Sequence, residues 1–196
     1  MKIVNNRSRG FTIIELMIAT TVFSVILLIA TMALIQIGRI YYKGVLSSKT
    51  QNVARGIIDE VANSIKFASN ANFVNALCTD NKRFSYKIGD QLDSSIPDDY
   101  GLVIDRPAAC DPNEPRGSSC SGDENCREML TPGMRLSKFN IVESPQGSGI
   151  WQITIGVVSG YTDLLNSDKD SCAASINAGG QCCAASELTT TVIKRV

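Results

Sequence analysis

The sequence predicts an α+β protein in which a long N-terminal helix packs, by its second half, on a small antiparallel β-sheet with disulfide-containing loops. Three observations predict this class. An apolar run extends from Phe11 to Ile35 with Glu15 as its only charge. A helical repeat of apolar residues continues to about residue 69. Short strand patterns and seven cysteines follow in the remainder of the chain.

The apolar run at residues 11–35 can span a membrane. As a helix that rises about 1.5 Å per residue it is roughly 37 Å long, which is enough to cross a bilayer. Lys2, Arg7 and Arg9 precede it, and no acidic residue lies among them. Because basic flanks stay in the cytoplasm, we expect residues 1–10 on the cytoplasmic side and the rest of the chain to be exported.

Glu15 is the exception within this run, because a carboxylate in an apolar span is costly and marks a functional site. The segment Gly10-Phe11-Thr12-Ile13-Ile14-Glu15 resembles the class III signal of type IV pilins and of type II secretion pseudopilins. The resemblance implies that residues 1–10 are a leader, cut by a prepilin peptidase between Gly10 and Phe11. It also implies methylation of Phe11 and pairing of Glu15 with the amino terminus of a neighbouring subunit. A buried ion pair is tolerable only when it is matched, so this pairing would select for the correct register in a filament.

Three other interpretations of this stretch are open. Thr12 and Glu15 fit a capping box, in which each side chain satisfies an amide of the first helical turn. Thr31-Met32-Ala33 is a passable signal-peptidase site, but the apolar core is too long for an ordinary secretory signal and carries a glutamate. A plain single-pass anchor, with no role for Glu15, is the third. We favour the pilin-like interpretation because the basic leader, the glycine, the phenylalanine, the glutamate and the unbroken span occur together.

Residues 36–69 continue the helix as an amphipathic segment. Their apolar residues recur largely at three- and four-residue steps among polar positions. Gly38, Gly44 and Gly56 weaken the helix by up to about 1 kcal/mol each relative to alanine. From residue 70 asparagine, aspartate, serine and glycine become frequent. We therefore expect the helix to end near Ser69-Asn70 and an exported, β-rich head domain at residues 70–196.

Five strand candidates follow in this head domain. They lie at residues 83–88, 101–105, 138–143, 150–158 and 188–194. The clearest places every second residue from Trp151 to Val157 on one face. The segment from residue 144 to 149 contains proline and two glycines and is typical of a hairpin turn. One face of such a sheet needs an apolar cover, which the second half of the helix can supply.

The seven cysteines all lie beyond the span, which favours disulfides over cytosolic thiols. They are Cys78, Cys110, Cys120, Cys126, Cys172, Cys182 and Cys183. A bridge from Cys172 to Cys182 or Cys183 would contribute about 3 kcal/mol, and it resembles the loop closed by cysteines near the C-terminus of many pilins. Because seven is odd, one thiol stays free or pairs with another chain, and the connectivity is open. A zinc site is the alternative, but the chain has no Cys-x-x-Cys pair and no histidine.

Asn166, Asp168 and Asp170 alternate like the first ligands of a calcium loop, and some pseudopilins bind calcium near their C-termini. The pattern is incomplete, since Ser171 replaces the expected glycine and Asn177 the bidentate glutamate. Without histidine, a nucleophile motif or a phosphate-binding glycine loop, we predict no enzyme and no cofactor. The net charge is zero and no block of like charges indicates nucleic acid as the main partner.

The sequence therefore predicts a structural subunit, a minor pilin or pseudopilin of a type IV pilus or type II secretion-like filament. The ending at residues 186–195 resembles the last strand of minor subunits of the J/PilW-like type, and the presence of Glu15 is unlike the tip subunit that lacks it. The resemblance implies a single-pass inner-membrane protein that later enters a periplasmic or extracellular filament. Its implied partners are prepilin peptidase, an inner-membrane assembly platform and other pilin or pseudopilin subunits. The alternative is a membrane-anchored exported binding or adhesion protein that does not polymerise and uses its loops between Cys110 and Cys126.

Overall fold

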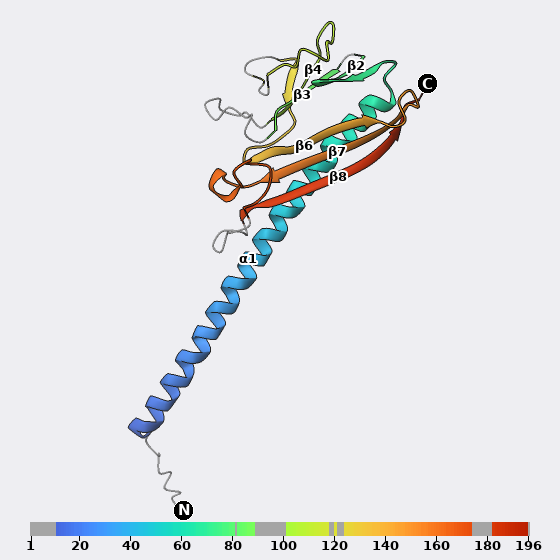
Figure 1. Cartoon of the computed structure of the whole chain (residues 1–196). Coiled ribbons are helices and arrows are strands. Elements are labelled where there is room, and N and C mark those ends of the chain that lie inside the picture. Colours follow the sequence, from blue (N-terminus) through green and yellow to red (C-terminus); the bar gives the residue numbers. More distant parts are fainter. Residues whose placement is uncertain are drawn as a thin grey trace, which may run out of the picture. The chain divides into compact units, whose positions relative to one another are not determined.

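The computed structural model describes residues 11–80, 82–88, 101–117, 120, 124–173 and 182–195, and Figure 1 shows the fold. The chain divides into two compact units, residues 1–41 and residues 42–196. One helix, α1 (Ile13–Lys66), precedes all the strands. The strands are β1 (Ala71–Phe73), β2 (Ala76–Thr79), β3 (Lys82–Tyr86), β4 (Leu102–Asp105), β5 (Cys126–Glu128), β6 (Met134–Glu143), β7 (Ile150–Ser159) and β8 (Ala184–Ile193), with a 3₁₀ turn, η2 (Thr162–Leu164), between β7 and β8. The predicted α+β class is confirmed.

In the first unit, α1 is helical from Ile13 onward and every described residue from 11 to 41 is exposed. The sequence has no glycine or proline between Phe11 and Ile37, so nothing in this stretch removes a backbone hydrogen bond or favours a break. This part of the helix therefore has apolar side chains on every face and no core of its own.

In the second unit, α1 buries one stripe of side chains, as the helical repeat predicts. The buried residues are Thr50, Ala54, Ile57, Ile58, Val61 and Ile65, which recur at three- and four-residue steps and so lie on one face. The helix ends at Lys66, earlier than the expected Ser69-Asn70. The backbone amides of Ser69 and Asn70 donate to the carboxylate of Asp80 at 2.6 and 2.8 Å, and this capping turns the chain towards β1.

The strands form two antiparallel sheets, where the sequence predicted one small sheet. The first has the order β1-β2-β3-β4-β5 and the second the order β6-β7-β8. The five predicted strands correspond to β3, β4, β6, β7 and β8. Strands β1, β2 and β5 were not predicted. They have three or four residues each, too few to show an alternation, and they lack the Leu-Val-Ile run that marks the equally short β4 as a strand.

One core joins the buried face of α1 to both sheets. The first sheet contributes Leu77, Phe84, Leu102 and Ile104, and the second contributes Met134, Leu136, Phe139, Ile141, Trp151, Ile153, Ile155 and Val157. The predicted inward face of β7, from Trp151 to Val157, is thereby confirmed. Tyr86 of the first sheet stacks on Phe139 of the second with ring centroids 4.8 Å apart, so aromatic contacts also connect the two sheets.

The hairpin between β6 and β7 is the predicted turn. The amide of Ser144 donates to the carbonyl of Ile150 at 3.0 Å, and the amide of Ser148 donates to that of Pro145 at 3.1 Å. Gly147 and Gly149 have φ values of +75° and +70°, a backbone region that favours glycine. The long strands β6 and β7 on either side of this turn are in register along their length except for one irregularity between Leu136 and Lys138.

Candidate functional site

The start of α1 carries Glu15, the charged residue of the apolar span. The carboxylate of Glu15 accepts hydrogen bonds from the amide and from the hydroxyl of Thr12, both at 2.9 Å. In return, the Thr12 hydroxyl accepts from the amide of Glu15 at 3.3 Å. This is the reciprocal capping box that the Thr12-x-x-Glu15 spacing predicts. Phe11, the residue directly before this box, is 82% exposed. Gly10 lies outside the described residues.

The other polar side chains of the span are satisfied within the helix itself. The hydroxyls of Thr20 and Thr21 donate to the carbonyls of Met17 and Ile18 at 3.0 and 2.8 Å. Ser24 and Thr31 donate in the same way, to residues three or four positions earlier. Hydroxyls paired in this manner carry little cost in hydrocarbon.

In the part of the chain that the structure describes, α1 is the one helix long and apolar enough to cross a membrane. None of the residues in its most apolar window is buried against the rest of the protein. Among the described residues nothing covers the exposed apolar side chains of residues 11–41, which is consistent with anchoring in lipid or packing against other helices.

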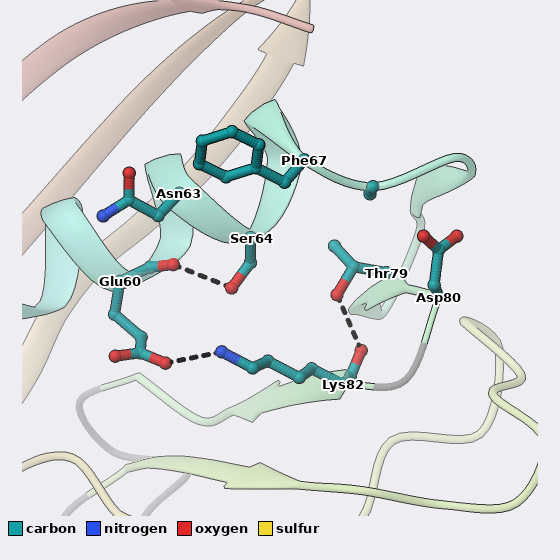
Figure 2. Close-up of a pocket in the computed structure, with 8 residues that line it drawn as sticks. Glu60, Asn63, Ser64, Phe67, Thr79, Asp80 and Lys82 are labelled. Atoms are coloured by element: carbon teal, nitrogen blue, oxygen red, sulfur yellow. Dashed lines mark hydrogen bonds and ion pairs between the residues drawn. The ribbon is translucent and has the colours of Figure 1, made fainter. Parts of the chain in front are cut away.

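A polar pocket of about 320 Å³ lies where the end of α1 meets the first sheet (Figure 2). The ammonium of Lys82 donates to the carboxylate of Glu60 at 2.8 Å. This hydrogen bond holds the pKa of Glu60 below its ordinary value. The two capped amides of Ser69 and Asn70 lower the pKa of Asp80 in the same way. Both carboxylates are thus ionised near neutral pH, so neither can serve as a general acid. Their hydrogen bonds instead connect the end of α1 to the first sheet.

Three disulfides stabilise the loops, and one cysteine is free. The bridges are Cys78–Cys110, Cys120–Cys126 and Cys172–Cys183. The partner of Cys172, which the sequence left open between Cys182 and Cys183, is Cys183, and Cys182 is the free cysteine among the described residues. The bridge from β2 to Cys110 ties the loop that follows β4 to the first sheet.

The Asn166–Asp170 segment is a turn closed by its own side chains. The side-chain oxygen of Asn166 accepts from the amides of Asp170 and Ser171 at 3.0 and 3.3 Å, and its amide nitrogen donates to Asp170 at 2.8 Å. Among the described residues no three acidic, cysteine or histidine side chains gather as a metal site would require. Calcium at Asn166, Asp168 and Asp170 stays a prediction.

Sequence reasoning missed the groups that lock the end of α1. Asp80 caps Ser69 and Asn70, and the amide of Arg195, just beyond β8, donates to the carbonyl of Lys66 at 3.0 Å. These pairs join segments far apart in the sequence, so no local motif carries them. The only signal in the sequence was Asp80 itself, an acidic residue directly after the short run Ala76–Thr79.

Residues 5–31 match the family model of the prokaryotic N-terminal methylation motif. No curated protein and no solved structure matches the chain. The match covers Glu15, the capping box and the four hydroxyl residues of the span, and it begins in the basic leader. The chain therefore carries, at the start of an exposed and membrane-competent helix, an N-terminal methylation signal of the type IV pilin class.

Proposed function

We propose that this protein is a minor pilin or minor pseudopilin, a structural subunit of a type IV pilus or a type II secretion-like filament. It enters the inner membrane as a precursor, is cut by prepilin peptidase between Gly10 and Phe11, and assembles through α1. The observation that carries the proposal is the methylation motif at residues 5–31 on a helix whose residues 11–41 are all exposed.

The hydrogen bonds of the polar side chains in the span support the transfer of α1 from lipid into a filament. Extraction exchanges lipid contacts for helix–helix contacts of similar apolarity, and the hydroxyls of residues 20, 21, 24 and 31 are already paired within their own helix. Glu15 is the group that still gains from a partner. Among the described residues its carboxylate accepts hydrogen bonds from the neutral donors of Thr12, and the positively charged amino terminus of a neighbouring subunit would neutralise it inside the filament.

The first experiment is mass spectrometry of the N-terminus of the protein purified from its native membrane. We expect a chain that begins at Phe11 and carries one methyl group on its amino nitrogen. A chain that retains residues 1–10 would contradict the proposal and favour the anchored, non-polymerising alternative.

The second experiment replaces Glu15. Glu15→Gln keeps the size of the side chain and removes the charge, so we expect normal insertion and cleavage but at least a tenfold loss of the protein from sheared filaments. Ser24→Ala is the matched control, because it removes a polar group of the same helix that is satisfied internally. Equal incorporation of Glu15→Gln and the wild type would overturn the assembly role of Glu15.

A further inference from the structure

A ring of basic and aromatic residues surrounds α1 at residues 39–43. The sequence there is Arg39-Ile40-Tyr41-Tyr42-Lys43, and every one of these residues is exposed. Tyr41 is 73% and Tyr42 is 55% exposed. Successive residues of a helix are about 100° apart, so Arg39 and Lys43 share one face and the two tyrosines occupy the others. We call these five residues the belt.

The belt has the composition of a segment that lies at the surface of a bilayer. Tyrosine rings collect at the membrane–water interface because one end is apolar and the other polar. Arginine and lysine place their stems along apolar surface and extend their charges into the headgroups. Within the described residues none of these four side chains forms an ion pair, a hydrogen bond or a ring contact with another side chain, which leaves their polar ends available to lipid.

We propose that the belt binds the lipid headgroup layer and sets the depth of α1 in the membrane. This inference rests on the membrane-inserted precursor of the proposed function. The hydrocarbon core is about 30 Å thick, which an upright helix crosses in about 20 residues. With Arg39 just outside the core, residues 19–38 fill it. Glu15 is then about 36 Å from Arg39 along the helix, roughly 6 Å beyond the far boundary of the core.

The consequence concerns the carboxylate of Glu15. Before assembly it lies in the headgroup layer at the N-terminal end of the span, together with Phe11, and not in the hydrocarbon. A tilt of more than about 34° would be needed to draw it inside, whereas membrane helices tilt by about 20° on average. The cost of burying the charge therefore arises only when α1 leaves the membrane, at the moment when a neighbouring subunit can supply its partner.

The test measures depth in the full-length chain reconstituted into vesicles of phosphatidylcholine and phosphatidylglycerol that carry bromine at a shallow or a deep acyl position. Tryptophan replaces Ile14, Leu27 or Tyr42 in turn, and Trp151, which is buried in the core of the second unit, gives the same background in each. We expect shallow bromine to quench residues 14 and 42 more than deep bromine, and the reverse at residue 27. If deep bromine quenched the tryptophan at position 14 more than shallow bromine did, and as strongly as it quenched the tryptophan at position 27, the proposal would be overturned.

A charge variant tests the belt itself. In the Tyr42→Trp chain, Arg39→Leu with Lys43→Leu should shift the quenching of residue 42 towards deep bromine. Lys49→Leu with Arg55→Leu removes two exposed charges of the same helix outside the belt and should leave the profile unchanged. Identical profiles for the two double variants would refute the role of the belt. Because quenching reports depth alone, this result is separable from the failure of cleavage or filament assembly.

Discussion

The most buried ion pair of the described residues lies on the first sheet, between Arg83 of β3 and Asp105 of β4. The guanidinium donates to both carboxylate oxygens, at 3.1 and 2.7 Å, and the Asp105 side chain is only 5% exposed. Arg83 also donates to the carbonyl of Glu114 at 3.0 Å. The pKa of Arg83 is raised mainly by its hydrogen bond with Asp105. This pair holds the loop after β4 against the sheet.

Asp105→Asn should therefore destabilise the fold by about 3 kcal/mol, because it removes the charge that accepts two hydrogen bonds from the largely buried guanidinium of Arg83. The measurement is the free energy of unfolding from urea titration of the full-length chain in detergent. Glu187→Gln is the control, since the Lys138–Glu187 pair has the same 2.7 Å separation but side chains that are 50% and 54% exposed. We expect that control to cost less than about 1 kcal/mol. Equal losses in the two variants would contradict the argument from burial.

Among these contacts, the sequence predicted those between residues close together in the chain but not those between distant residues. Thr12 and Glu15 are three residues apart, so the spacing alone predicted their reciprocal hydrogen bonds. Arg83 and Asp105 are 22 residues apart and meet only because β3 and β4 pair in register. The charge of each residue was visible in the sequence, but its partner depends on the register of a sheet.

Among the elements, β7 depends on one glycine. Gly156 faces the irregularity of β6 between Leu136 and Lys138. A Cβ atom at residue 156 would lie 2.5 Å from the hydroxyl oxygen of Ser137 and 2.9 Å from the Cβ atom of Lys138. The hydroxyl of Ser137 can rotate away, but the contact with the Cβ atom of Lys138 cannot be relieved without movement of the backbone. Glycine at this position allows the central strand of the second sheet to pack against the displaced residue of its neighbour.

Gly156→Ala should thus destabilise the protein, by roughly 1–3 kcal/mol, through overpacking. Gly56→Ala is the matched substitution on α1, where a Cβ atom would meet nothing within 4 Å, and it should stabilise the helix by up to about 1 kcal/mol. The midpoints of urea unfolding should move in opposite directions. A shift of both midpoints to higher urea concentration would show that backbone entropy outweighs packing at residue 156.

The long elements were predictable because periodicity accumulates over many residues. α1 and the three long strands show their apolar repeats in the sequence, whereas β1, β2 and β5 are too short for any repeat. The cysteine pairs could not be derived in the same way, since six paired cysteines allow 15 connectivities. The choice of Cys183 over Cys182 depends on the position of each sulfur near the start of β8, which spacing does not determine.

For the second unit as a whole, two carboxylates link the end of α1 to the first sheet. Glu60 pairs with Lys82 of β3 at 2.8 Å, and Asp80 caps the amides of Ser69 and Asn70. The pKa of Glu60 is lowered from its ordinary 4.5, mainly by the hydrogen bond from Lys82. The pKa of Asp80 is lowered from 3.8 by the two backbone amides. Both groups therefore make the stability of this unit dependent on pH.

A carboxylate with a lower pKa in the folded than in the unfolded state binds fewer protons when folded. Its contribution is fully present above the unfolded pKa and is lost as the pH falls through the folded pKa. We therefore expect the midpoint of thermal unfolding to be constant near neutral pH. It should decline below about pH 4.5, as the stabilisation from the ionised carboxylate of Glu60 begins to be lost, and decline further below about pH 3.8 through the carboxylate of Asp80. Circular dichroism of the full-length chain in detergent measures this midpoint between pH 7 and pH 3.

The double variant Glu60→Gln with Asp80→Asn separates these two groups from the other acids of the chain. It should unfold at a lower temperature than the wild type at pH 7, because the Lys82 pair and the charged cap are gone. At pH 3 the difference should shrink, since the wild-type carboxylates are then also losing their charge. The two curves should converge as the pH falls. Parallel curves would mean that the ionisation of these carboxylates does not connect the helix to the sheet, and that the apolar core alone holds them together.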